Sequence, residues 1–126
     1  MKQSLAVKAA DRGRILTQAV AEVARHFDIS STELGAILGI SQSSASRLMN
    51  ASYTLREQHK EWELAALLVR LYRGVYSIVG SNDNLAKDWL KSRNKAFGDQ
   101  IPSEVIRQAS GLVYACDYVD AHRAPT

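Results

Sequence analysis

The sequence predicts an all-α protein, because helical periodicity is the only periodic signal in its 126 residues and no segment alternates as a strand does. Two short helices are predicted around Gly39, which gives an N-terminal helix-turn-helix unit, and one long apolar helix follows them. A turn cluster at residues 80–83 marks the boundary with a small C-terminal helical domain. We therefore expect two units, residues 1–80 and residues 81–126.

The first unit opens with an amphipathic helix over about residues 15–27. Its apolar side chains recur at steps of three and four residues: Ile15, Leu16, Ala19, Val20, Val23, Ala24 and Phe27. We expect this helix to pack under the helix-turn-helix and to end at Asp28. Before it, Arg12 and Arg14 could belong to a minor-groove arm, but a disordered terminus is the preferred interpretation.

The helix-turn-helix is predicted with its core and its caps. Gly39 suits the sharp bend because glycine enters the left-handed region without a Cβ penalty. Ser30 and Glu33 have the spacing of a capping box, and Ser41 can cap the second helix. The apolar residues are spaced to pack the two helices against each other: Leu34, Ile37, Leu38, Ile40, Ala45 and Leu48.

The second helix leaves a row of polar side chains pointing outward, and these are the candidate DNA contacts: Gln42, Ser43, Ser46, Arg47 and Asn50. Short polar side chains and an arginine suit base edges and phosphates in a major groove. The charge distribution agrees weakly, since residues 1–60 hold eight Lys or Arg against five acidic residues, whereas residues 61–126 hold eight of each. The alternative is an ordinary helical hairpin with a solvated polar face.

A second capping-box spacing, Thr54 with Glu57, predicts a long helix from about Leu55 to Val79. This helix is apolar on two faces, so it must be covered on two sides. We expect its own core on one side and a second copy of the chain on the other, which gives a homodimer or a higher assembly. The alternative is the central core helix of a monomer.

Composition indicates the class of protein and its compartment. The chain is 46% hydrophobic and 23% charged, as is usual for a globular protein, and neither a membrane span nor a signal peptide is recognisable. We therefore expect a cytoplasmic protein. The single cysteine, Cys116, cannot form an intramolecular disulfide. The three histidines are too scattered for a metal site, and Asp117 and Asp120 lack an accompanying nucleophile, so no metal, cofactor or enzymatic activity is expected.

The C-terminal unit is predicted to hold three short helices. The first, over about residues 84–91, points Leu85 and Trp89 inward, with Leu90 as a further candidate. After a loop, Pro102 opens a second helix that ends near Gln108. The last helix carries one buried stripe of Leu112, Cys116 and Val119.

One further pattern extends without gaps over residues 84–121. Its members are Ala86, Trp89, Leu90, Asn94, Phe97, Gly98, Pro102, Val105, Ile106, Gly111, Asp117, Tyr118 and Val119. This pattern resembles the toxin-binding domain of the Xre/MbcA/ParS antitoxins, and the preceding helix-turn-helix extends the resemblance over most of the chain. The chain departs from the pattern at Arg93, where proline is usual, and at Ile101, where threonine is usual.

The resemblance implies a function. Antitoxins of this family pair with RES-domain toxins, typically occlude a cleft that handles NAD or a related nucleotide, and repress their own operon. By this resemblance the toxin contacts are Arg93, Asn94, Phe97, Tyr118, His122 and Arg123. An arginine-bearing tail suits a pyrophosphate position because a guanidinium matches phosphate geometry.

Two alternatives stay open. The chain could be a stand-alone helix-turn-helix regulator without a toxin partner, whose C-terminal region dimerises or senses a ligand. It could also be a toxin inhibitor whose helix-turn-helix is purely structural. A neighbouring gene for a RES-domain protein distinguishes the first alternative, and a gel shift with the upstream DNA distinguishes the second.

Overall fold

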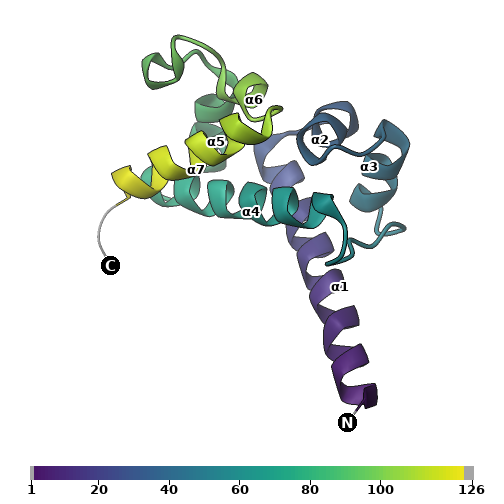
Figure 1. The fold of residues 1–126 in the computed structure, drawn as a ribbon. Coiled ribbons are helices and arrows are strands. Elements are labelled where there is room, and N and C mark those ends of the chain that lie inside the picture. The colour runs from purple at the N-terminus through teal and green to yellow at the C-terminus, as the bar shows by residue number, and fades with distance from the viewer. Residues whose placement is uncertain (1, 124–126) are drawn as a thin grey trace.

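The computed structural model describes residues 2–123, and this part of the chain is built from helices packed around one continuous core (Figure 1). Its only strand-like pairing is a single bridge between Asn94 and Gln100. The predicted all-α class is confirmed. The elements are α1 (Lys2–Phe27), α2 (Ser31–Leu38), α3 (Gln42–Met49), α4 (Lys60–Ile78), α5 (Asp83–Lys91), the 3₁₀ turn η1 (Lys95–Phe97), α6 (Pro102–Val105) and α7 (Ala109–His122).

Helix α1 is longer than predicted, because it begins at Lys2 where a disordered terminus was expected. Its first turns project away from the other helices (Figure 1). The expectation that Ile15 faces the core is wrong, since its side chain is 57% exposed. Gly13 and Thr17 form the buried side of this part of α1, and a residue two positions from each of them points elsewhere on a helix.

The segment before α4 is a loop that lies directly on α1. The Leu55 backbone N–H donates to Thr17 Oγ1 at 3.0 Å, and a Cβ on Gly13 would stand only 2.8 Å from the Leu55 carbonyl oxygen. Leu55 is fully buried by this contact. The predicted helix start near Leu55 is therefore wrong, because a contact with a distant helix holds this segment extended. Glu57, expected in a capping box, instead pairs with Arg12 at 2.6 Å.

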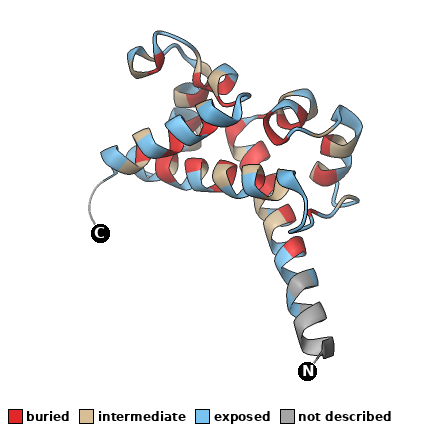
Figure 2. Cartoon of the chain, in the orientation of Figure 1, coloured by how far each residue is buried: buried red, intermediate tan, exposed pale blue. Residues whose placement is uncertain are grey.

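Helix α4 is covered on both sides by its own chain, with α1 against one side and α7 alongside the other (Figure 1). The approach of α7 is close, since a Cβ on Gly74 would lie 2.5 Å from Val119 Cγ2. The buried members of α4 include Ala65, Leu68, Val69, Leu71 and Val75 (Figure 2). This packing matches the alternative of a central core helix, while the half-buried Trp62 and the exposed Ala66 leave part of one face of α4 open.

The helix-turn-helix has the predicted caps. Ser30 Oγ accepts the Glu33 N–H, and Glu33 Oε1 accepts the Ser30 N–H, both at 3.1 Å. Gly39 ends α2 with a φ of 72°, and Ser41 Oγ accepts the Ser44 N–H at 3.0 Å. Five of the six predicted core residues of this unit are buried: Leu34, Ile37, Leu38, Ala45 and Leu48. The sixth, Ile40 in the turn, is only half-buried and packs against this core.

The chain turns sharply between α4 and α5, as the turn cluster predicts. Gly80 and Ser81 both have positive φ, and the side chain of Asn82 caps α5 by accepting the Leu85 N–H at 3.0 Å. No single helix within residues 2–123 is long and apolar enough to cross a membrane. Helices α4 and α5 meet that criterion of length and composition only as a joined pair, and they are bent by 117°.

Helix α5 buries only part of the predicted face, since Leu90 is buried as expected and Leu85 is not. Ala86 and Leu90 are fully buried four residues apart, whereas Leu85 is 50% exposed and Trp89 is half-buried. The inward assignment of Leu85 is wrong because α5 packs against α1 and α4 through the Ala86 and Leu90 face.

Helices α6 and α7 approach closely at Gly111, where an added Cβ would stand 2.0 Å from the Val105 carbonyl oxygen. We expect Gly111→Ala to lower the free energy of unfolding by about 1–3 kcal/mol, because the two helices must separate to admit the methyl group. Urea unfolding measures the change. Ser110→Ala, at the exposed neighbouring position, is the matched control and should stay within about 0.5 kcal/mol of the parent. Equal stability of the two variants would contradict this account.

Candidate functional site

The outward side of α3 carries most of the candidate DNA contacts on exposed surface. Gln42, Ser43, Arg47 and Asn50 are exposed, whereas Ser46 is only half-exposed. Gln42 Nε2 donates to Ser31 Oγ at 3.1 Å, which ties the start of α3 to the start of α2. The structure therefore places four of the five candidates where a ligand can reach them fully.

The Arg47 guanidinium is held in an outward position by two contacts. One nitrogen donates to Ser44 Oγ at 3.1 Å, and the central carbon lies 5.9 Å from the centroid of the Tyr53 ring. The Tyr53 hydroxyl in turn donates to Glu61 Oε1 at 2.8 Å, and burial followed by this hydrogen bond raises the pKa of Tyr53. A guanidinium held in this way loses less conformational entropy when it binds an anion.

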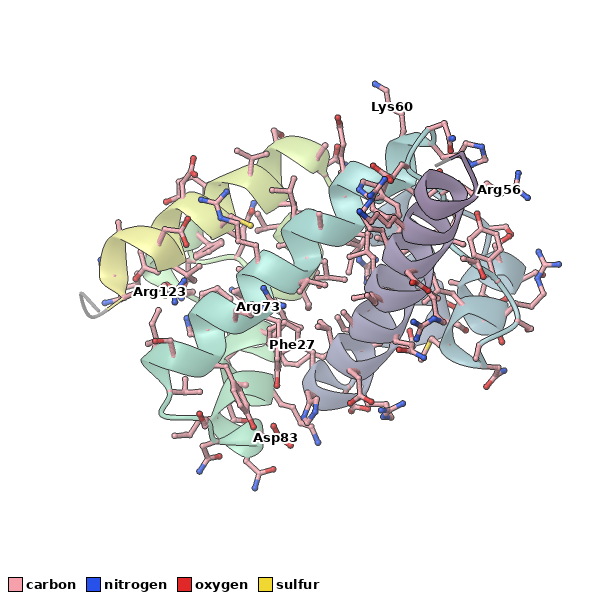
Figure 3. The ribbon with its side chains drawn as sticks, turned by 90° about the horizontal axis from the view of Figure 1, so that it is seen from below. Phe27, Arg56, Lys60, Arg73, Asp83 and Arg123 are labelled. Carbon is pink, nitrogen blue, oxygen red and sulfur yellow. The ribbon has the colours of Figure 1, made fainter. Side chains whose placement is uncertain are left out.

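The loop that follows α3 adds cations that the sequence analysis missed. Arg56, His59 and Lys60 are exposed, and Arg56 and His59 line one hollow together with Tyr53. Figure 3 shows Arg56 and Lys60 projecting from the same edge of the molecule. Sequence analysis placed this segment inside a long helix. The available signal was the group of three basic residues, Arg56, His59 and Lys60, that follows Tyr53 closely in the sequence. Cations beside an exposed polar helix suit the phosphates that flank a major groove.

The carboxylate of Glu33 connects α2 to the C-terminal elements. Its Oε2 lies 3.0 Å from Lys91 Nζ on α5 and 4.0 Å from the guanidinium of Arg107, which follows α6. Burial raises the pKa of Glu33, but hydrogen bonds from Lys91 and Ser30 outweigh it and hold the pKa below its usual value. The group that caps the helix-turn-helix is therefore also an anchor for α5.

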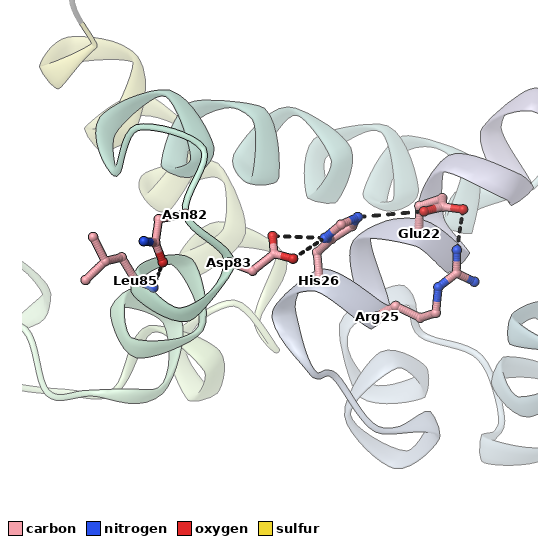
Figure 4. A network of polar contacts seen from close by, with 6 residues as sticks. All are labelled: Glu22, Arg25, His26, Asn82, Asp83 and Leu85. Carbon is pink, nitrogen blue, oxygen red and sulfur yellow. Dashed lines mark hydrogen bonds and ion pairs between the residues drawn. The ribbon is translucent and has the colours of Figure 1, made fainter.

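A second polar network joins α1 to the start of α5 (Figure 4). His26 Nδ1 lies 3.0 Å from both carboxylate oxygens of Asp83, and its Nε2 lies 3.7 Å from Glu22. Hydrogen bonds from His26 and then from Tyr76 lower the pKa of Asp83. The start of α5 is thus tied to α1 by hydrogen bonds and its end to α2 by a salt bridge.

Aromatic side chains gather on the C-terminal elements in one connected cluster. Phe97 packs edge to face against Trp89, Tyr114 and Tyr118, with ring centroids 5.2–5.5 Å apart, and Tyr118 stacks on His122 at 4.2 Å. The structure brings the predicted residues Phe97, Tyr118 and His122 together. It also adds Trp89 and Tyr114, which sequence analysis did not place at this surface. Phe97 is buried, so it anchors η1 and does not offer an exposed face.

Arg93 and Asn94, the two polar toxin contacts predicted in the loop around η1, have different surroundings. Asn94 shapes the loop, because its Oδ1 accepts the Ala96 N–H at 2.9 Å and its backbone N–H donates to the Gln100 carbonyl oxygen at 3.0 Å. Arg93 is exposed and lies 3.7 Å from Asp99. Of the pair, Arg93 is the one whose side chain is free to meet a partner's surface.

The end of α7 lies far from the helix-turn-helix. His122 and Arg123 are both exposed, and His122 Nδ1–H donates to the Tyr118 carbonyl oxygen at 2.8 Å. Figure 3 shows Arg123 at the opposite end of the molecule from Arg56 and Lys60. The rest of the tail, residues 124–126, lies outside the described residues.

Cys116 and Asp120, which were considered as possible catalytic groups, are both held by contacts within the chain. Cys116 is buried with its Sγ donating to the Leu67 carbonyl oxygen, and burial raises the pKa of its thiol to about 11. Asp120 is paired with Arg70, which leaves Asp117 alone on that face of α7. In the part of the chain that the structure describes, no group of three or more His, Cys, Asp or Glu is placed to hold a metal ion.

Two family models match the chain over adjoining ranges. The antitoxin Xre-like helix-turn-helix domain matches residues 6–70, and the antitoxin Xre/MbcA/ParS C-terminal toxin-binding domain matches residues 75–124. No curated protein matches it. The first range is half of the chain and contains α2 and α3, while the second contains α5, η1, α6 and α7. The chain therefore belongs to the Xre/MbcA/ParS antitoxins, with a helix-turn-helix domain for DNA and a C-terminal domain for a toxin.

Proposed function

We propose that this antitoxin neutralises a RES-domain toxin by occluding its active site and represses its own operon through the helix-turn-helix. The observation that carries the proposal is the separation of the two surfaces, since α3 and the end of α7 lie at opposite ends of one helical body. A chain built in this way can hold DNA and a second protein at once. We assign DNA binding and dimerisation to residues 1–80 and toxin binding to residues 81–126.

For DNA, the proposal assigns base contacts to α3 and phosphate contacts to the loop after it. Gln42 and Ser43 stand at the start of α3, and Arg47 follows one turn later, as a helix entering a major groove requires. Arg56 and Lys60 supply charge for the flanking phosphates. Ser46 is the weakest candidate because it is half-buried, and Asn50 lies at the C-terminal end of α3.

For the toxin, the proposal places the exposed cations and the aromatic cluster against the rim of a nucleotide-handling cleft. Arg123 follows α7 directly and can enter such a cleft, where a guanidinium suits the position of a pyrophosphate. Arg93 and the stacked pair Tyr118 and His122 flank it. The chain would act by binding alone, with no cofactor. A stand-alone regulator is the alternative, and the match to a toxin-binding domain favours the toxin partner.

A second copy of the chain is also part of the proposal, because one helix-turn-helix makes few base contacts and paired half-sites are the common solution. An apolar hollow between α1 and α4 supports it, with lining residues that include Ile15, Leu16, Trp62 and Val69. Ile15 in this hollow is 57% exposed, and burying an apolar side chain of this size against a second copy would stabilise the dimer. We expect the homodimer to form on this surface.

The first prediction from this proposal concerns DNA. Arg47→Ala should weaken binding to the DNA upstream of the operon by about 1–3 kcal/mol, because a guanidinium contact to a base or phosphate is lost. A gel shift measures the change. Arg93→Ala removes an equally exposed arginine at the toxin-facing end and should leave the shift unchanged. Equal binding by both variants would argue that α3 does not read DNA.

The second prediction concerns the tail. Deleting residues 122–126 should leave the toxin partly active at saturating antitoxin, because the cleft is no longer filled. NAD consumption by the purified toxin measures the effect. Arg123→Ala tests the guanidinium alone and should cause a smaller loss of inhibition. Complete neutralisation by the truncated chain would remove the tail from the mechanism.

The third prediction concerns assembly. We expect the chain to sediment as a dimer at micromolar concentration and the Ile15→Asp variant to sediment as a monomer, because a buried unpaired carboxylate is costly. Sedimentation equilibrium measures both. A monomeric parent chain would overturn the homodimer.

A further inference from the structure

One side of α7 is left uncovered by the rest of the chain. The buried stripe of α7 packs against α4, and it comprises Leu112, Ala115, Cys116 and Val119. On the outer side, Val113 and Tyr114 are 45% and 48% exposed. Two neighbouring large apolar side chains therefore stay half-exposed on the outer side of α7, where they could belong to an apolar interaction surface.

A hollow of about 360 Å³ opens beside Tyr114, between the η1 loop and the start of α7, and Val113 is not part of its lining. Its lining includes Phe97, Gly98, Val105, Gly111 and Tyr114. Gly98 has no side chain to fill it, and nothing lies within 4 Å of where a Cβ on Gly98 would stand; at Gly111 that space is already taken by the Val105 carbonyl. A partner's side chain can therefore approach the backbone directly.

Tyr114 is fixed in place at the edge of this hollow. Its hydroxyl donates to the Ala96 carbonyl oxygen, and its ring packs edge to face on Phe97 at 5.2 Å. A half-exposed aromatic ring that is already held loses little conformational entropy on binding. Rigid tyrosines next to a pocket are the kind of residue that carries binding energy in protein interfaces.

We propose that Val113, Tyr114 and the hollow beside them form a docking surface for the toxin, distinct from the tail that enters its cleft. This inference rests on the proposed function. The surface lies wholly within residues 75–124, the range that matches a toxin-binding domain. It is also continuous with the predicted toxin contacts, because Tyr114 and Tyr118 pack on the same Phe97 ring.

The chemistry of the surface specifies the toxin segment that fits it. The hollow accepts the apolar part of a side chain of moderate size against Phe97 and Val105, while Gln100 and Ser110 add polar groups to its lining. A neighbouring depression shares Val105 and Gly111 and is bordered by the exposed carboxylate of Glu104. We expect a toxin loop with an apolar residue flanked by a basic one. Docking there would supply affinity, whereas the tail supplies inhibition.

The test uses residues 1–126 and a purified RES-domain toxin as the probe. Val113→Asp puts a charge on the uncovered side of α7, and Ser110→Trp places a large ring at the rim of the hollow from an exposed position. Each should weaken toxin binding about tenfold or more in isothermal titration calorimetry. Leu85→Asp is the matched control, since Leu85 is equally exposed on α5, and its affinity should stay within about twofold of the parent.

The outcomes separate the inference from the function on which it rests. A parent chain that does not bind the toxin overturns the proposed function. A parent chain that binds, together with two variants of unchanged affinity, overturns only the docking surface. Variants that keep the toxin affinity but lose a self-association step would assign this surface to a second copy and also overturn the inference. Unchanged melting temperature and DNA gel shift in both variants confirm that the fold is intact.

Discussion

The enclosure of α4 between α1 and α7 is the packing on which both functional surfaces depend. One side of α4 carries α1, which supports the helix-turn-helix, and the other side carries α7, which ends next to Arg123 at the proposed toxin contacts. The second contact requires a glycine, because any side chain at Gly74 would collide with Val119. A single buried helix thus fixes the distance between α3 and Arg123, and neither surface has to be built on a flexible linker.

The loop before α4, which lies on α1, determines in the same way how the proposed DNA-binding surface is built. The bond from the Leu55 N–H to Thr17 Oγ1, together with the absence of a side chain at Gly13, holds the loop flat on α1. Arg56 and Lys60 are then presented at the edge of the molecule beside α3. If a helix began at Leu55, Arg56 and Lys60 would be distributed around that helix and would not be presented by a loop beside α3. The positive charge beside α3 is therefore a consequence of a contact between residues far apart in the sequence.

This difference between local and distant contacts explains what the sequence could predict. The caps at Ser30 and Ser41 and the bend at Gly39 depend on neighbours within a few residues, so the pattern of the sequence was sufficient for them. The orientation of Leu85 and the start of α4 depend on which helix lies alongside, and local periodicity does not contain that information. For the same reason Tyr114 could not be placed beside Phe97 before the η1 loop was seen to fold back over α7.

Helix α5 ties the two surfaces together. His26 holds Asp83 at its start, and Glu33 holds Lys91 at its end, so α5 is fixed to α1 and α2 at both ends. Coupling between two binding sites requires an element with two arrangements whose balance both ligands change. A helix anchored twice, inside a continuous core, favours one arrangement. If toxin binding changes the affinity for DNA, a rigid chain of this kind favours an effect of assembly over a conformational change. The number and spacing of the assembled chains would then set the affinity, because linked binding steps change affinity without any change in the single chain.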